Sequence, residues 1–346
     1  MKVNIDDFDE YQGKSVKKIT LANDRQVQIS LLSQGALWHE FLVPSSATCS
    51  NDNLILNFAH TADYYQNPFY LGMSIGRTGG RISKGSFTQG EQLIQLPQNE
   101  GANNLHGGPR GFHSYNWSFD TQTKTDSASV TFENSIKAES DGYPGDLKVT
   151  ITYTLNNLNQ VIIQYHGQAF DQPVLFNPTN HVYFNLTGNV DILDHELRLN
   201  SHERLAVDQQ KLPTGEFKAT AGTPFDFSQF KPLASCINGL QDTTEKGLDD
   251  VYVVDNEVPA PAAVLRAPTA NRQVEIYSAR KGLVVFTANS FTADMPLTNG
   301  AGHPYQGIAL ETQTLPDSVH HTNFGNIVLP AHQVVDYQTV YQYSEI

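Results

Sequence analysis

A short polar stretch around His181 combines three side chains that could bind a ligand and move a proton. If residues 177–188 form a strand, His181, Tyr183 and Asn185 share one face and apolar residues fill the other, because successive side chains alternate. An imidazole, a phenol and an amide offer the donors and acceptors expected of a pocket for a polyhydroxylated ligand. A hydrogen-bonded strand histidine with only a structural role is the alternative interpretation.

Two acidic segments could supply a general base. In residues 307–317, alternation places Glu311 and Gln313 on a face with small residues, which leaves room beside the carboxylate. A carboxylate at an open, partly shielded site is a candidate base, whereas one on a solvated sheet face is the alternative. Asp249 and Asp250 must point to opposite faces of a strand, so only one of them can enter a pocket; two solvated turn aspartates are the alternative.

The glycine-rich loop over residues 99–112 could bring His106 and its backbone close to a ligand, although a tight structural loop is also consistent with this pattern. His320 and His321 are adjacent, so their side chains diverge in an extended segment, and no third ligand has a recognisable spacing. We therefore expect neither a metal nor a cofactor.

The run Gly72–Gly76 matches the G-x-S-x-G pattern of a nucleophile elbow, but its context argues against a serine hydrolase. An elbow needs a helix after the serine, and residues 77–85 are too rich in glycine to begin a stable one. The His-Gly-Gly sequence at 106–108 also follows the motif, whereas an oxyanion loop should precede it.

The elements that must position these residues are strands. Apolar and polar residues alternate in several segments, which are separated by turn-forming residues, and long helical periodicity is hard to find. The clearest alternating segments are 27–31, 147–155, 161–165 and 273–277. We predict an all-β fold of large antiparallel sheets packed as a sandwich with few short helices, formed by a single domain over residues 1–346.

Composition narrows the classes of function. The 346 residues carry a formal net charge of −14, which leaves no broad cationic surface for nucleic acid or an anionic membrane. The first residues lack an apolar signal core and no stretch is long enough to span a membrane, so we expect a cytoplasmic protein. With only Cys49 and Cys236, a disulfide framework or a multi-cysteine zinc site is not expected.

Taken together, the ordered motifs resemble the aldose 1-epimerase family, the galactose mutarotases, along nearly the whole chain. The motifs that carry this resemblance are Gly76-Arg77 with Arg81-Ile82 and Gly85-x-Phe87; Asn99 with Asn104-Leu-His106-Gly-Gly108 and Gly111-Phe112; Asp141-Gly-Tyr-Pro-Gly145; Thr179-Asn-His-Val-Tyr-Phe-Asn-Leu186; Pro213-Thr-Gly215; Gly222-Thr-Pro-Phe-Asp-Phe227; Gly247-Leu-Asp249; and Glu311-Thr-Gln-x-x-Pro-Asp317.

The resemblance implies a galactose mutarotase-type β-sandwich and interconversion of the α and β anomers of an aldohexose such as galactose or glucose. It implies that Glu311 is the general base, His181 the general acid and His106 a second histidine near the ring oxygen. Substrate-binding residues are then expected at Arg81, Asp249, Asn104, Tyr183 and Gln313. The implied partner is a small-molecule monosaccharide.

Two departures from the family pattern concern substrate contacts. The family often has Asn where this chain has Gly80, and often Gln near the position of Val284, so two polar contacts are missing. Asp250 also replaces a common His, but alternation points it away from the pocket. The alternatives are a sugar-binding or sensing protein on the same fold, a glycoside hydrolase using Glu311 and Asp249, or an epimerase for a disaccharide reducing end or a sugar phosphate.

Overall fold

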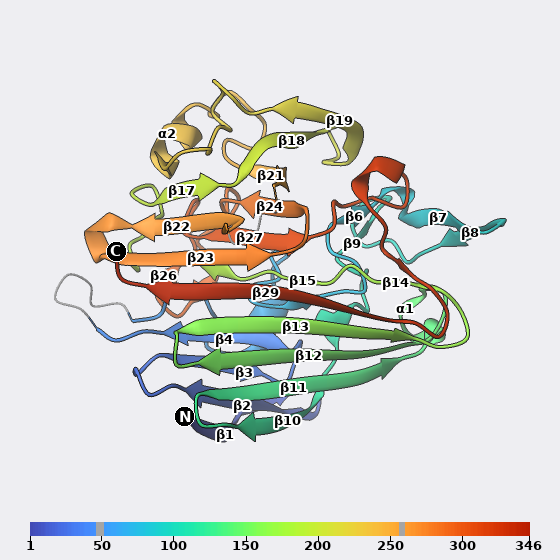
Figure 1. The fold of residues 1–346 in the computed structure, drawn as a ribbon, viewed down its shortest axis with the longest axis horizontal. Coiled ribbons are helices and arrows are strands. Elements are labelled where there is room, and N and C mark those ends of the chain that lie inside the picture. The colour runs from blue at the N-terminus through green and yellow to red at the C-terminus, as the bar shows by residue number, and fades with distance from the viewer. Residues whose placement is uncertain (46–51, 256–259) are drawn as a thin grey trace.

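The computed structural model describes residues 1–45, 52–255 and 260–346, and β-strands dominate it (Figure 1). Within these ranges, α-helix is confined to α1 (Ala138–Asp141) and α2 (Leu233–Asn238). The predicted all-β fold is confirmed. Cys49 lies outside the described residues, and no helix within them has the length and apolar character needed to cross a bilayer.

A nine-stranded antiparallel sheet forms one layer of the molecule. Its central strand in Figure 1, drawn in dark red, is the C-terminal strand β29, which pairs with β13 on one side and β23 on the other. In order across the sheet, the strands are β10 (Ser118–Thr123), β11 (Ser127–Ile136), β12 (Leu147–Asn156), β13 (Gln160–Ala169), β29 (Val334–Ser344), β23 (Arg272–Ser278), β22 (Ala263–Ala267), β17 (Glu196–Leu199) and β20 (Lys231–Pro232).

A six-stranded antiparallel sheet carries four of the eight predicted site residues, namely Tyr183, Asp249, Glu311 and Gln313. Its strands, in order, are β16 (Tyr183–Phe184), β27 (Ile308–Gln313), β24 (Gly282–Phe286), β21 (Asp249–Val254), β18 (Ser201–Val207) and β19 (Pro213–Ala219). A third sheet of four strands contains β1 (Lys2–Tyr11), β2 (Lys14–Ala22), β3 (Gln28–Leu32) and β4 (Leu37–Leu42).

The sheets bury their apolar faces against one another. In β12 every second residue from Leu147 to Leu155 is buried, as period-two alternation predicts. Trp38 of β4 lies in this core, with its ring edge-on to Tyr153 of β12, Phe184 of β16 and Tyr341 of β29. One indole therefore joins all three sheets, which is the packing expected of a sandwich.

Short two-stranded ribbons extend from the sheets and shape their edges. They are β5 (Ser74–Ile75) with β15 (Thr179–Asn180), β6 (Arg81–Ile82) with β9 (Asn104–Leu105), β7 (Ser86–Gln89) with β8 (Gln92–Gln95), β14 (Val174–Leu175) with β28 (Val328–Leu329), and β25 (Pro296–Leu297) with β26 (Gly300–Ala301). The hydroxyl of Ser74, the serine of the G-x-S-x-G pattern, is buried beside the carbonyl of Ala36 and the hydroxyl of Tyr153. This burial agrees with the prediction that Ser74 is not a nucleophile.

A buried ion pair anchors the segment that leads into β6. The Arg77 guanidinium makes two hydrogen bonds, of 2.7 and 3.0 Å, to the Asp141 carboxylate at the end of α1, and both side chains are almost fully buried. Arg77 also donates to the carbonyl oxygen of Gly145. The chain therefore enters β6, and reaches Arg81, from a fixed position.

Candidate active site

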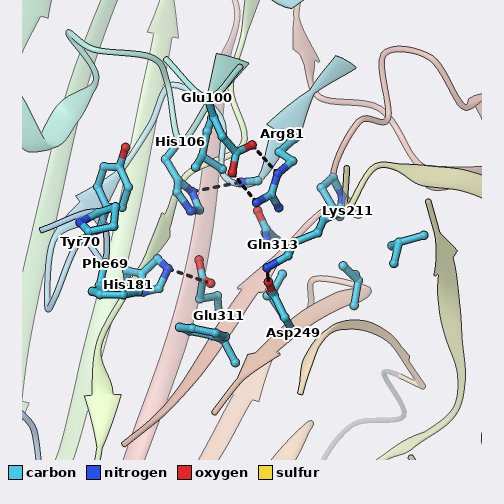
Figure 2. A pocket seen from close by; sticks show the side chains of 18 of the residues that line it. Phe69, Tyr70, Arg81, Glu100, His106, His181, Lys211, Asp249, Glu311 and Gln313 are labelled. Carbon is cyan, nitrogen blue, oxygen red and sulfur yellow. Dashed lines mark hydrogen bonds and ion pairs between the residues drawn. The ribbon is translucent and has the colours of Figure 1, made fainter. Parts of the chain in front are cut away.

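A cleft of about 350 Å³ opens over the six-stranded sheet and the β6–β9 ribbon. Figure 2 shows polar side chains from several elements converging on it. Of the eight residues predicted for the site, seven line the cleft: Arg81, His106, His181, Tyr183, Asp249, Glu311 and Gln313. The structure thus brings together residues that are separated by up to 232 positions in the sequence, from Arg81 to Gln313.

Glu311 and His181 face each other across the cleft (Figure 2). Glu311 lies in β27, where Ile308 and Leu310 point into the core, so alternation turns its carboxylate to the opposite side. His181 directly follows β15, and its backbone is hydrogen-bonded to the backbone of Gly72 and Met73. The His181 Nε2 atom lies 3.4 Å from Oε1 of Glu311, which places an acid and a base side by side.

Burial controls the charge of this pair. It lowers the pKa of His181 to about 4 and raises the pKa of Glu311 well above its usual value, because both charged forms lose solvation. The Asp249 carboxylate raises the pKa of both residues, and Arg81 lowers that of Glu311. Burial therefore favours the neutral forms of both side chains in the empty cleft.

His106 reaches the cleft from the loop after β9, and a backbone contact fixes its tautomer. The Gly80 amide donates to Nδ1 of His106 over 3.2 Å, so Nδ1 is the acceptor and Nε2 carries the hydrogen of the neutral ring. Burial lowers the pKa of His106 well below its usual value. His106 is therefore a neutral N–H donor at the cleft.

His106, His181 and Glu311 also bring three possible metal-ligand atoms within 4.8 Å of one another. A metal-binding histidine normally donates its second ring nitrogen to an acceptor and binds the metal through the unprotonated one. His106 is arranged the opposite way, because its Nδ1 accepts from Gly80 and its Nε2 is protonated. The donor set does not fit a metal.

Two groups of ion pairs also lie in the cleft, one at Arg81 and one at Lys211. Arg81 makes two hydrogen bonds of 2.6 Å to the carboxylate of Glu100. The Lys211 ammonium contacts Oδ2 of Asp249 at 2.5 Å and Oε2 of Glu245 at 2.9 Å. Both predicted sugar-binding charges, Arg81 and Asp249, are thus already paired in the empty cleft.

Asp250 points away from the cleft, as the alternation in β21 predicts. Its carboxylate is paired with Arg204 of β18 at 2.9 Å, and the Arg204 guanidinium lies over the ring of Phe225. Burial raises the pKa of Asp250 to about 6 even though Arg204 opposes the shift. Asp250 therefore belongs to the packing behind β21 and leaves Asp249 to line the cleft.

Gln313 and Tyr183 both line the cleft, but only Gln313 has unpaired polar atoms there. Both amide atoms of Gln313 are buried and lack hydrogen-bond partners within the described residues, and so does Oε2 of Glu311. The Tyr183 ring stacks on His181 with centroids 5.1 Å apart, and its hydroxyl donates to the carbonyl of Phe69. Gln313 can receive a ligand hydroxyl, whereas Tyr183 supports the His181 ring.

Asn104 is the predicted site residue that does not line the cleft. Its amide donates to the carbonyl oxygen of Pro97 and its Oδ1 accepts from the hydroxyl of Tyr143. The side chain is fully buried, so these contacts hold the β9 strand and the following loop in place. The structure gives Asn104 a position behind His106.

The two departures noted in the sequence also lie on the cleft wall. Gly80 has a φ of +69°, and a Cβ there would lie 2.5 Å from Cβ of Pro316, so a larger residue does not fit. Val284 of β24 pairs across the sheet with Glu311 and with Val251 of β21. The cleft wall therefore has an apolar side chain at Val284 and no side chain at Gly80.

Sequence reasoning missed Glu100 and Lys211, which pair with two of the predicted residues. Glu100 belongs to a polar loop, and Lys211 lies in the β18–β19 connection, so alternation does not predict which way either side chain points. The signal available for Lys211 was the motif at residues 213–215, which begins two residues after it.

The chain is similar to known proteins along nearly its whole length. Residues 17–342 match the family model described as aldose 1-epimerase. A maltose epimerase from Levilactobacillus brevis is 41% identical over 96% of each chain, and the human galactose mutarotase is 32% identical over 96% of this chain and 95% of its own. The crystal structure of a galactose 1-epimerase from Lactobacillus acidophilus superposes with a TM-score of 0.87, 28% identity and 99% coverage of both chains.

Proposed function

The chain belongs to the aldose 1-epimerase family, and on that basis we propose that it interconverts the α and β anomers of an aldohexose such as galactose or glucose, with Glu311 as general base and His181 as general acid. The observation that carries the proposal is the distance of 3.4 Å between His181 Nε2 and Glu311 Oε1 inside an open cleft. The anomeric hydroxyl and the ring oxygen are bonded to the same carbon, so the groups that act on them must flank one small volume.

The reaction needs one base and one acid. Glu311 removes the proton of the C1 hydroxyl while His181 donates a proton to the ring oxygen, so the bond between C1 and that oxygen breaks and a C1 aldehyde forms. The open chain then turns about the bond between C1 and C2. On reclosure, the ring hydroxyl attacks the other face of C1, its proton returns to His181, and the former carbonyl oxygen takes the proton from Glu311.

The proton count of the pair fits this cycle. Ring opening starts from ionised Glu311 and protonated His181 and leaves both residues neutral, which is the form that burial favours in the empty cleft. Reclosure returns a proton to His181 and removes one from Glu311, which restores the ion pair. No proton has to enter from solvent during a turnover.

The remaining residues of the cleft are suited to holding the sugar. His106 offers a neutral Nε2–H donor, and the unpaired amide of Gln313 offers both a donor and an acceptor. Arg81 can exchange its present partner for sugar hydroxyls, whereas Asp249 contacts Lys211 through Oδ2 and can accept from a sugar hydroxyl while that contact persists. Arg81 does not serve as the acid, because a guanidinium does not release its proton at physiological pH.

The reducing end of a disaccharide such as maltose is a second candidate substrate. It is favoured by the relative named maltose epimerase, which is 41% identical to this chain. A sugar phosphate is disfavoured, because the two cations of the cleft, Arg81 and Lys211, are already paired with Glu100, Glu245 and Asp249. Phosphate would have to displace carboxylates.

The catalytic proposal is tested by following freshly dissolved α-D-glucose, α-D-galactose and maltose by polarimetry or proton NMR. We expect acceleration by the wild type and losses of about 10²- to 10⁴-fold in kcat for Glu311→Gln and His181→Asn, since each removes one positioned proton-transfer group. Glu203→Gln, at an exposed carboxylate of β18, is the matched control and should keep full activity.

The same assay separates the proposal from its alternatives. A sugar-binding or sensing protein would bind without changing the approach to anomeric equilibrium, and a glycoside hydrolase would release glucose from maltose. Wild-type turnover in either Glu311→Gln or His181→Asn, with an intact fold by circular dichroism, would remove that residue from its assigned role.

A further inference from the structure

Lys211 holds an unusual position over the cleft. It lies in the connection between β18 and β19, yet its ammonium reaches the carboxylate of Asp249 on the neighbouring strand β21. A second contact joins it to Glu245, in the loop before β21. Figure 2 shows the side chain extended beside Asp249 and Gln313. Lys211 therefore ties two loops together at the wall of the cleft.

The backbone of the β18–β19 connection places Lys211 firmly. The Asp208 carboxylate accepts hydrogen bonds from the amides of Gln210 and Leu212, and the Lys211 amide donates to the Asp208 carbonyl. Lys211 itself takes the left-handed conformation, with a φ of +61°. A tightly closed turn with this geometry costs conformational freedom, and it directs a long side chain across the cleft instead of leaving it in solvent.

The Lys211 ammonium keeps one N–H donor that neither carboxylate uses. A lysine ammonium has three N–H donors, and the contacts to Asp249 and Glu245 use two of them. Burial alone would lower the pKa of Lys211, but the two carboxylates outweigh it and raise the pKa, so the group stays charged. One charged donor thus remains at a cleft-lining side chain.

Apolar side chains and one neutral amide accompany Lys211 in the lining of the cleft. Val207, Val251 and Val284 line it and are apolar. Gln313, which lies beside Lys211 in Figure 2, has an unpaired amide but no charge. A ligand hydroxyl at this wall would therefore find Lys211 as a charged donor, with Asp249 as its partner.

We propose that Lys211 determines which sugar the cleft accepts, by donating its third N–H to one hydroxyl of the bound ring while Asp249 and Glu245 hold the other two. This inference rests on the proposed function, because it takes the sugar to lie between the Glu311–His181 pair and the β18–β19 connection. Lys211 binds the part of the ring that does not react, so its contact persists through ring opening. Uniform binding of this kind changes affinity and leaves kcat nearly unchanged.

The test combines one substitution with a set of deoxy sugars. Dissociation constants of D-glucose and of its 2-, 3-, 4- and 6-deoxy analogues are measured by NMR titration of the wild type and of Lys211→Met, which keeps the length of the side chain and removes its charge. We expect one analogue to bind the wild type about 10- to 100-fold more weakly than glucose does, as for loss of a hydrogen bond to a charged group. Lys211→Met should bind glucose equally weakly and show no further loss with that analogue.

The controls separate a sugar contact from a structural role. Lys246→Met removes an exposed lysine one residue from Glu245 and should leave every dissociation constant unchanged. Equal weakening of glucose and all four analogues in Lys211→Met, or no weakening, would overturn the inference. Should Lys211→Met fail to fold by circular dichroism, Lys211→Gln repeats the test.

The binding data do not depend on turnover, so the two proposals can fail separately. If the wild type binds the sugars with the expected pattern but does not accelerate mutarotation, the catalytic proposal fails and the Lys211 contact stands. If the wild type accelerates mutarotation but Lys211→Met leaves the binding of the deoxy sugars unchanged, the catalytic proposal stands and the Lys211 contact fails.

Discussion

At the scale of single residues, the protonation of the His181–Glu311 pair predicts the acidic limb of the pH profile. The pKa of His181 is lowered to about 4, so kcat/KM should stay high as the pH falls below 6.5 and decline only as it approaches 4. Below that value both side chains are protonated, and Glu311 can no longer accept a proton. The measurement is the enzyme-catalysed rate after subtraction of the spontaneous rate at each pH. An acidic limb centred near 6.5 would contradict the prediction, and His202→Gln, at an exposed histidine, should leave the position of the limb unchanged.

Period-two alternation predicted the direction of the polar side chains where strands are regular. Glu311 and Gln313 point into the cleft while Leu310 points into the core, and Asp249 and Asp250 separate as expected. Alternation carried no information about Lys211, because a turn residue with positive φ has no sheet face. Its charge partners lie 34 and 38 positions away, so only the folded chain reveals them.

Gly80 predicts a stability difference between two glycine substitutions. Gly80→Ala and Gly90→Ala both force alanine into positive φ, at a cost of about 1–2 kcal/mol each. Only at Gly80 does the added Cβ also meet Pro316, whereas Gly90 faces open space. We expect Gly80→Ala to lose about 1–3 kcal/mol more of the free energy of unfolding in urea, the usual cost of overpacking. Equal losses would show that the chain relaxes around Pro316.

At the scale of elements, the predicted strands formed with small changes at their ends. The segments 147–155 and 273–277 became β12 and β23, while 161–165 extended to β13 over Gln160–Ala169. The order of the strands could not be predicted, because β29 pairs with β13 and β23, which are far from it in sequence. Alternation predicts which face of the sheet a residue lies on, but it does not predict which strand lies next to it.

The Arg77–Asp141 pair predicts how strongly α1 is bound to the segment before β6. Replacing Arg77 with Met would leave a buried carboxylate without its partner, which typically costs about 3–5 kcal/mol of the free energy of unfolding. Lys137→Met is the control, since the Lys137–Asp146 pair is largely exposed and should contribute about 0–1 kcal/mol. Urea denaturation of both variants measures the difference. Similar small losses would mean that Asp141 finds water or another donor.

At the scale of the whole molecule, Trp38 predicts how far the three sheets depend on one another. Its ring contacts residues of all three, so Trp38→Ala should cost about 3–5 kcal/mol, as for other large-to-small changes in a core. A single unfolding transition should persist by fluorescence and circular dichroism. Phe170→Ala, at a residue that is 39% exposed, should change stability far less. Two separated transitions would also contradict the prediction of one domain over residues 1–346, which stays a prediction until then.

The place of β29 in the middle of the nine-stranded sheet has a consequence for synthesis of the chain. Strands β13 and β23 are made first, and the gap between them is filled only by residues 334–344. Glu311 is likewise made after both of these strands. A nascent chain that does not yet include residues 334–344 therefore exposes two unpaired strand edges, and the sheet can close only after those residues have been made.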